Sequence, residues 1–510
     1  MTTTRLVGVL LPLCLLTSLR AVSIQKDDPL LDESYNISRR LGGNERLYYL
    51  IEFCRVDGLN NHPWDKTKEA ASALFDLAST EQNMQLHVLG QKNGASCLSY
   101  VDPAAAAEQL TQINFERPRP GQWVYEDPRY NSAQTIFNNL LTSSGKFPPR
   151  RVVANIIAKA KYLGQTGQYP YLAVAEVINR LPSSFKNEQN TLLGDAVGFY
   201  ASETGFYNRD EEFLRLLQTL KTPSIDKTIF AQALTIFVQR LNEDSIHFPG
   251  DYYAEIHVKS SGKVFPFMDR NEAFRFQAFP LIERFIPGKA AELRHLDSRL
   301  TQATGTMTYV PGGFVQGNPT STQAAHQHLQ WLQESLLERI KACQDTNPQA
   351  TAILAQRLTD LPSRIIGFSA SIPGIARLNS TEARSLYEKQ LSDLGNVRDS
   401  VDKLRAMVAL VPAAHHIGDF KQYEHLSTQA LDMGIQFFNN DDQAKRAGRR
   451  EGFSELRDLV TSTASLSSDI LKAKVQNLPD GWLKGYLWLY EAVGRTQLKF
   501  PPAPSKSCSN

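Results

Sequence analysis

Apolar residues recur at helical spacing over residues 152–164. Residues three and four positions apart share one face of a helix, and this face carries Val153, Ile156, Ile157, Ala160 and Leu163. Residues 171–181 repeat the same offsets, and the connection between the two stretches runs from Gly164 to Gly167. A short connection that contains glycine is typical of a turn between antiparallel helices. The pattern therefore predicts a helical hairpin over 152–181.

The same apolar stripe returns along the chain. It covers residues 213–220 and 230–237, then 404–411 and 426–437, and finally 483–493. One amphipathic hairpin leaves a side of its stripe in water, whereas stacked hairpins bury their stripes against one another. We therefore predict a mainly α fold of stacked antiparallel helical hairpins, which is an irregular, α-solenoid-like arrangement. Ordinary helix pairs within a globular helical domain are the alternative.

The helix pairs around 150–182 and 398–438 resemble degenerate tetratricopeptide-type helical repeats. They depart from the 34-residue consensus of that family at its Trp, Gly and Pro positions. The resemblance implies a scaffold that binds other proteins.

One stretch departs from the helical pattern. Tyr253, Glu255, His257 and Lys259 alternate with apolar residues up to Ser261 and Gly262, and Val264, Phe265 and Phe267 follow. Alternation of this kind around a glycine turn predicts a small β-hairpin near 252–267. Residues 305–320 are rich in glycine and proline, and this composition favours a linker or a long surface loop.

These boundaries suggest a division of the chain. We expect a signal peptide over 1–23, an N-terminal helical region over 24–304 that includes the β-hairpin, the linker over 305–320, a C-terminal helical region over 321–498, and a disordered tail over 499–510.

The first 23 residues have the layout of a secretory signal peptide. Arg5 precedes an apolar run from Leu6 to Leu16, and Ala21 and Ser23 are the small residues that a cleavage after Ser23 requires. An uncleaved N-terminal anchor is the alternative, but the run is short for a membrane span. The sequence thus predicts an exported protein, periplasmic or secreted, without a transmembrane span after cleavage.

Charge and cysteine content narrow the possible partners. Cleavage after Ser23 would remove Arg5 and Arg20, which leaves 53 basic and 53 acidic residues. This balance argues against nucleic acid as a partner. Four cysteines would remain, Cys54, Cys97, Cys343 and Cys508. An oxidising compartment permits disulfides among them, with Cys54 and Cys97 the favoured pair, although the pairing stays open and buried unpaired thiols are the alternative.

The sequence contains little that predicts a reaction centre. His326 and His328 diverge on a helix, as do His415 and His416, so we expect no metal site and assign no cofactor. Ser369 lies in Gly367-Phe368-Ser369-Ala370-Ser371, which lacks the last glycine of the G-x-S-x-G nucleophile elbow. Asp210, Glu211 and Glu212 fit the charged first turn of a helix better than a catalytic cluster.

Aromatic residues give one candidate contact. Trp488 lies off the stripe formed by Leu483, Tyr486, Leu487 and Tyr490, so we expect it to face a partner. The leading hypothesis is an exported, non-enzymatic helical scaffold or binding protein for a protein or a cell-envelope component. The alternative is an exported hydrolase with Ser369 or carboxylates in a cleft between the two helical regions. A purely structural protein is a third possibility.

Overall fold

The structure is a computed structural model that describes residues 29–58, 65–115, 127–202, 209–220, 224–243, 251–258, 261–305, 307–315, 333–334, 336–341, 343–344, 346–440, 452–466 and 469–499. The chain forms two compact units. Unit 1 combines the residues up to Lys66 with those from Leu332 onward, and unit 2 comprises Thr67–Trp331. The fold is mainly α with one small antiparallel sheet, as the sequence predicted.

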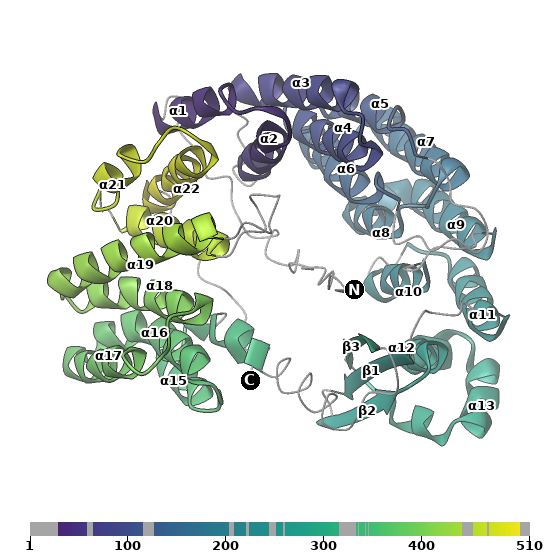
Figure 1. The fold of residues 1–510 in the computed structure, drawn as a ribbon. Coiled ribbons are helices and arrows are strands. Elements are labelled where there is room, and N and C mark those ends of the chain that lie inside the picture. Colours follow the sequence, from purple (N-terminus) through teal and green to yellow (C-terminus); the bar gives the residue numbers. More distant parts are fainter. Residues whose placement is uncertain are drawn as a thin grey trace. The chain divides into compact units, whose positions relative to one another are not determined.

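Unit 2 is a stack of helices with a small sheet at one end (Figure 1). Its helices are α3 (Asp65–Thr80, which begins just before the unit boundary), α4 (Met84–Leu98), α5 (Pro103–Leu110), α6 (Tyr130–Ser143), α7 (Arg150–Thr166), α8 (Tyr171–Arg180), α9 (Lys186–Ser202), α10 (Arg209–Thr219), α11 (Lys227–Glu243), α12 (Arg270–Phe285) and α13 (Pro287–Leu296). Two short 3₁₀ helices cover Ser183–Phe185 and Ser298–Gln302.

The helices of unit 2 pack in two alternating rows. Helices α4, α6, α8, α10 and α12 each contact the next member of that series, while α7 contacts α9 and α9 contacts α11. A helix therefore packs against the helix two places along the chain as well as against its sequence neighbour. This alternation buries the predicted stripes.

Local residues account for the helix ends. The Asn83 side chain accepts hydrogen bonds from the backbone N–H groups of Gln85 and Leu86, and Asp102 caps α5, whose first residue is Pro103. Ser400 caps α18 (Val401–His416) in the same way. Such caps satisfy the N–H groups that a helix leaves unbonded in its first turn.

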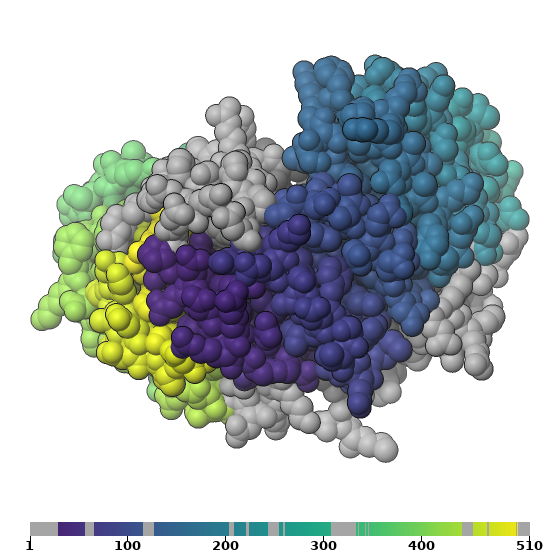
Figure 2. Space-filling model, turned by 90° about the horizontal axis from the view of Figure 1, so that it is seen from above, coloured from purple at the N-terminus to yellow at the C-terminus, as the bar shows by residue number. Residues whose placement is uncertain are grey.

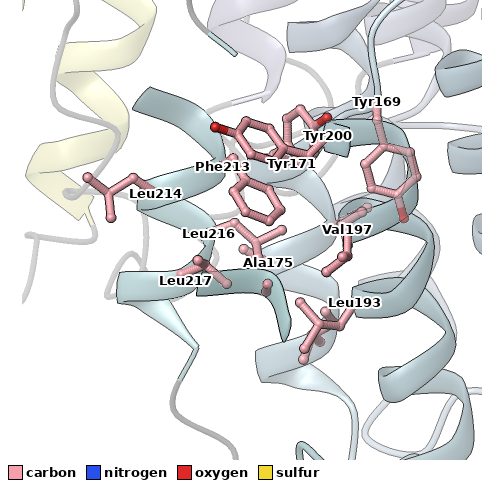
Figure 3. Packing of buried hydrophobic residues seen from close by; sticks show 14 of the residues in the cluster. Tyr169, Tyr171, Ala175, Leu193, Val197, Tyr200, Phe213, Leu214, Leu216 and Leu217 are labelled. Carbon is pink, nitrogen blue, oxygen red and sulfur yellow. The ribbon is translucent and has the colours of Figure 1, made fainter. Parts of the chain in front are cut away.

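The core of unit 2 is rich in aromatic rings (Figure 3). Tyr200 and Phe213 stack with their ring centroids 4.0 Å apart, and Tyr171 meets Phe213 edge-on at 5.6 Å. These rings come from α8, α9 and α10, so one cluster joins three successive helices.

The sheet confirms one sequence prediction and corrects another. Strands β1 (Asp251–Val258) and β2 (Lys263–Phe267) form the predicted hairpin, with Ile256 opposite Phe265. Strand β3 (Met307–Val315) pairs antiparallel with the other edge of β1, with Ile256 opposite Tyr309. The prediction of a linker or loop over 305–320 is therefore wrong for 307–315. Glycine and proline are tolerated here because β3 is an edge strand whose outer side needs no ladder bonds.

Unit 1 is also a helical stack. Its helices are α1 (Pro29–Ser38), α2 (Gly43–Gly58), α15 (Pro348–Ala355), α16 (Leu361–Leu378), α17 (Ser380–Leu394), α18, α19 (Phe420–Asn440), α20 (Phe453–Ser465), α21 (Lys472–Gln476) and α22 (Trp482–Lys499). Helices α16, α18, α20 and α22 contact one another in series, and α17 and α19 pack between successive members.

The N-terminal helices close this stack by packing on α22. Figures 1 and 2 both show α1 and α2, in purple, beside the yellow C-terminal helices. The Ser34 hydroxyl donates to the backbone oxygen of Gly485 at 3.1 Å, and a Cβ atom at Gly485 would lie 2.8 Å from the Tyr49 hydroxyl oxygen. Glycine at this position thus lets the N-terminal helices approach α22 closely.

The units differ from the division expected from the sequence. We expected 24–304 and 321–498 to be separate regions, but residues 29–66 belong with the C-terminal helices. The reason is that α1 supplies an apolar face that covers α22, and local periodicity does not reveal which distant helix covers which. The expected signal peptide lies outside the described residues, as does residue 500 onward of the expected tail, whereas residue 499 ends α22.

Candidate functional site

The described residues of unit 1 form a groove. It has a volume of about 650 Å³ and lies between α16, α18, α20 and the helical residues 336–341. We call it the α16–α18–α20 groove. Its apolar lining consists of Leu337, Ile340, Ile366, Ala370, Pro373, Ala409, Pro412 and Leu466. Its polar lining consists of Lys341, Gln344, Ser369, Arg377, His416, Ser462 and Ser465.

Glycines and prolines of α16 and α18 shape the walls. A Cβ atom at Gly374 would lie 2.6 Å from Pro348 and 3.0 Å from the backbone oxygen of Gln344, so glycine permits the close approach that forms one wall. Pro373 and Pro412 lie inside α16 and α18 and line the groove. Proline has no N–H group, and the Ser369 carbonyl in the groove wall therefore lacks its usual helical donor.

The charged lining residues of the groove are basic. Lys341 pairs with Glu338 at 3.5 Å, and both side chains are more than half exposed. Arg377 lies in the last turn of α16 and its Nε donates to the Pro373 carbonyl at 3.3 Å. Among the described lining residues no carboxylate is present. The groove therefore suits an apolar group that carries a negative charge.

Ser369 and His416 line the same groove, although the sequence pattern did not connect them. Ser369 lies inside α16, is 2 % exposed, and its hydroxyl donates to the Ile365 carbonyl at 2.7 Å. A nucleophile elbow needs a strained turn after a strand, and this serine is in a regular helix. Ser369 lies within unit 1, and all residues that line its groove belong to this unit.

The neighbouring histidine has a different environment. His415 packs its ring edge-on against Phe420 and Tyr423, with centroid distances of 5.5 and 5.2 Å. Burial lowers the pKa of His415, because the imidazolium form would lose hydration. Within the described residues no cluster of His, Cys, Asp and Glu is arranged to hold a metal ion. His326 and His328 lie outside the described residues.

The acidic residues 210–212 form the first turn of α10, as the sequence indicated. Asp210 is 1 % exposed and accepts bonds from Arg270 Nη1 at 2.6 Å and from the Tyr200 hydroxyl at 2.8 Å, while Arg209 lies at 3.2 Å. Burial alone would raise the pKa of Asp210, but the two guanidinium groups outweigh it and the pKa is lowered. This cluster is a buried, paired network in unit 2.

The expectation that Trp488 faces a partner is wrong. Trp488 is 2 % exposed, because α1, α2, α20 and α21 all contact α22. Periodicity identified one apolar face of α22, yet the neighbouring helices together also cover the side that carries Trp488.

Three cysteines are not the buried unpaired thiols that the sequence left open as the alternative. Cys54, Cys97 and Cys343 are each disulfide-bonded, whereas Cys508 lies outside the described residues.

The α16–α18–α20 groove has to be interpreted from its chemistry, because the comparisons with known proteins give no match. No model of a known protein family matches the chain, and a search of curated proteins finds no match. In the described part of the chain, no helix combines the length and apolarity needed to cross a membrane.

Lys341, Gln344 and Arg377 were not identified from the sequence. Their positions follow no motif, because α16 and residues 336–341 come together through tertiary packing. The only local signal is the occurrence of Pro373 and Pro412 inside otherwise apolar helical stretches.

Proposed function

We propose that the protein is an exported, non-catalytic helical binding protein, and that the α16–α18–α20 groove receives an apolar, acidic segment of a partner protein. The observation that carries this proposal is the lining of the groove, which joins an apolar floor to Lys341 and Arg377. Its volume of about 650 Å³ is within the usual range for ligand sites.

Two further features support the proposal. The disulfide bonds of Cys54, Cys97 and Cys343 fit an oxidising compartment, in agreement with the signal-like N-terminus. The Ser369 hydroxyl is engaged with the Ile365 carbonyl, which does not prepare it for nucleophilic attack.

A fluorescent probe tests the groove directly. 8-Anilinonaphthalene-1-sulfonate combines apolar rings with a negative charge, as the proposed partner segment does. The Ala409→Phe variant fills the groove, whereas Ala473→Phe adds the same ring at an exposed position of α21 outside the groove lining. We expect Ala409→Phe to weaken probe binding roughly tenfold, which is about 1.4 kcal/mol, and Ala473→Phe to bind as the wild type does. Equal binding by all three proteins would contradict the proposal.

The partner itself is tested with the same variants. Immobilised wild-type protein and Ala473→Phe should retain the same protein from a cell-envelope extract, and Ala409→Phe should not. A Lys341→Glu variant should also lose that protein, because it introduces a carboxylate into a basic rim. Retention by Ala409→Phe would place the partner elsewhere.

A hydrolase is the second candidate function. The specific observation in its favour is that Ser369 and His416 line one groove. We expect that the wild-type protein does not hydrolyse ester or peptide substrates through Ser369. Any turnover that is measured should therefore be the same in Ser369→Ala. Turnover that disappears in Ser369→Ala, with an unchanged circular-dichroism spectrum, would replace the binding proposal.

A further inference from the structure

Interior prolines of two neighbouring helices line the α16–α18–α20 groove. Pro373 lies inside α16 and Pro412 inside α18, and these two helices contact each other. Both prolines are partly exposed there. Proline destabilises a helix interior, because it has no N–H group and its ring clashes with the carbonyl four residues earlier. Two such positions on the walls of one groove direct attention to the backbone groups that the prolines change.

Each proline leaves one backbone carbonyl without its usual donor. In an α-helix a carbonyl accepts from the N–H group four residues later, so the carbonyls concerned are those of Ser369 and Val408. Each lies on the face of its helix that carries the proline ring, because that ring packs against it. Ser369 itself and Ala409, the neighbour of Val408, also line the groove. The walls therefore carry two backbone acceptors.

The serine hydroxyls of the lining are acceptors as well. Ser369, Ser462 and Ser465 each donate to a backbone carbonyl three or four residues earlier, at 2.7, 2.9 and 2.8 Å. A hydroxyl has one proton and two lone pairs. Since each proton is engaged with the serine's own helix, the oxygen atoms can only accept from a ligand.

This arrangement indicates what a bound segment must offer. The hydroxyls and the two carbonyls call for donors, and Lys341 and Arg377 call for an acid. A helical segment uses its N–H groups internally beyond its first turn. An extended segment has free N–H groups along its whole length, together with apolar and acidic side chains.

We propose that the segment bound in the α16–α18–α20 groove is extended, and that its backbone N–H groups donate to the Ser369 and Val408 carbonyls. This inference rests on the proposed function, because it specifies how the apolar, acidic segment of the partner is recognised.

The test uses the full chain and two small probes. One is the tetrapeptide acetyl-Val-Leu-Asp-Val-amide, and the other is its depsipeptide, in which ester oxygens replace the backbone N–H groups. Both carry the same side chains. Isothermal titration calorimetry at up to millimolar probe should show that the wild-type protein binds the peptide roughly tenfold more tightly than the depsipeptide, which is about 1.4 kcal/mol.

Proline variants locate the acceptors. Pro373→Ala and Pro412→Ala each restore an N–H group that occupies the freed carbonyl, and alanine suits a helix interior. Each should weaken peptide binding severalfold and leave depsipeptide binding unchanged. Pro280→Ala is the matched control, because Pro280 is an interior proline of α12 in unit 2, and it should bind both probes as the wild type does. Circular dichroism checks the fold of each variant.

Equal binding of peptide and depsipeptide by the wild type would overturn the inference, since the segment would then bind through its side chains alone. Peptide binding by Pro373→Ala and Pro412→Ala that equals that of Pro280→Ala would also overturn it, as would absence of peptide binding to the wild type. In each case the proposed function still stands if 8-anilinonaphthalene-1-sulfonate binds the wild type and Ala409→Phe weakens that binding. It falls with the inference if Ala409→Phe binds that probe as the wild type does.

Discussion

At the scale of single residues, buried charge in unit 2 is the feature with the largest energetic consequence. Asp210 is paired with Arg270 and Arg209, all three of which are less than 10 % exposed. Removing one member of a buried charge network leaves the others without compensation, and this costs more than the network contributes to stability when it is intact.

We predict that Asp210→Asn lowers the free energy of unfolding by about 3–5 kcal/mol at neutral pH. Tyr200→Phe removes only one hydrogen bond to the same carboxylate and should cost about 1 kcal/mol. Urea denaturation followed by circular dichroism measures both. Equal midpoints for the two variants would show that the charge pairing is not the larger contribution.

The same carboxylate gives a direction for pH dependence. The pKa of Asp210 in the folded protein lies below its ordinary value of 3.8. The stabilisation is therefore complete above that value and is lost as the pH falls through the folded pKa. The wild-type protein should lose stability on acidification below pH 3.8 more steeply than Asp210→Asn does.

At the scale of elements, α22 shows how packing changes the meaning of a sequence pattern. Its apolar stripe predicted one buried face, yet the helix is covered by α1, α2, α20 and α21. A Cβ atom at Gly494 would lie 2.4 Å from the Thr461 backbone oxygen, so α20 and α22 approach each other closely there.

Trp488→Ala should therefore behave as a core substitution. We expect the free energy of unfolding to fall by about 3–5 kcal/mol, because the change leaves a cavity where a buried indole was packed. Gln497→Ala, at an exposed position of the same helix, should change it by less than about 0.5 kcal/mol. Thermal or urea unfolding compares the two. A stable, folded Trp488→Ala protein that lost only a binding partner would instead support the contact role.

At the scale of the whole molecule, the disulfide bonds are expected both to stabilise the fold and to require an oxidising compartment. Cys54, Cys97 and Cys343 are each disulfide-bonded and are at most 4 % exposed. Burial protects such bonds from reductants in the native state, and export would allow them to form.

We predict that iodoacetamide labels none of these three cysteines in denatured, non-reduced protein and labels all three after reduction. Reduction should lower the melting temperature, because loss of a native disulfide costs about 2–4 kcal/mol. Mass spectrometry of the alkylated peptides and a circular-dichroism melt with dithiothreitol provide the two measurements. Labelling without reduction would show that these cysteines are free thiols, and they would then no longer support export.

The sequence by itself determined the local features. The stripes at 152–164 and 171–181 became α7 and α8, and the alternation near 252–267 became the β1–β2 hairpin. The start of α5 is equally local, since Asp102 accepts a hydrogen bond from the Ala105 N–H and Pro103 is the first helical residue. Each of these depends on residues within a few positions of one another, where side-chain periodicity and backbone geometry decide the outcome.

Only the tertiary structure decided which elements meet. Strand β3 pairs with β1 across about fifty residues, and α1 packs on α22 from the opposite end of the chain. The groove that joins Lys341, Ser369 and His416 also depends on such meetings. The physical reason is that an apolar stripe records that a face is buried but not which surface covers it, since hydrophobic burial is non-directional.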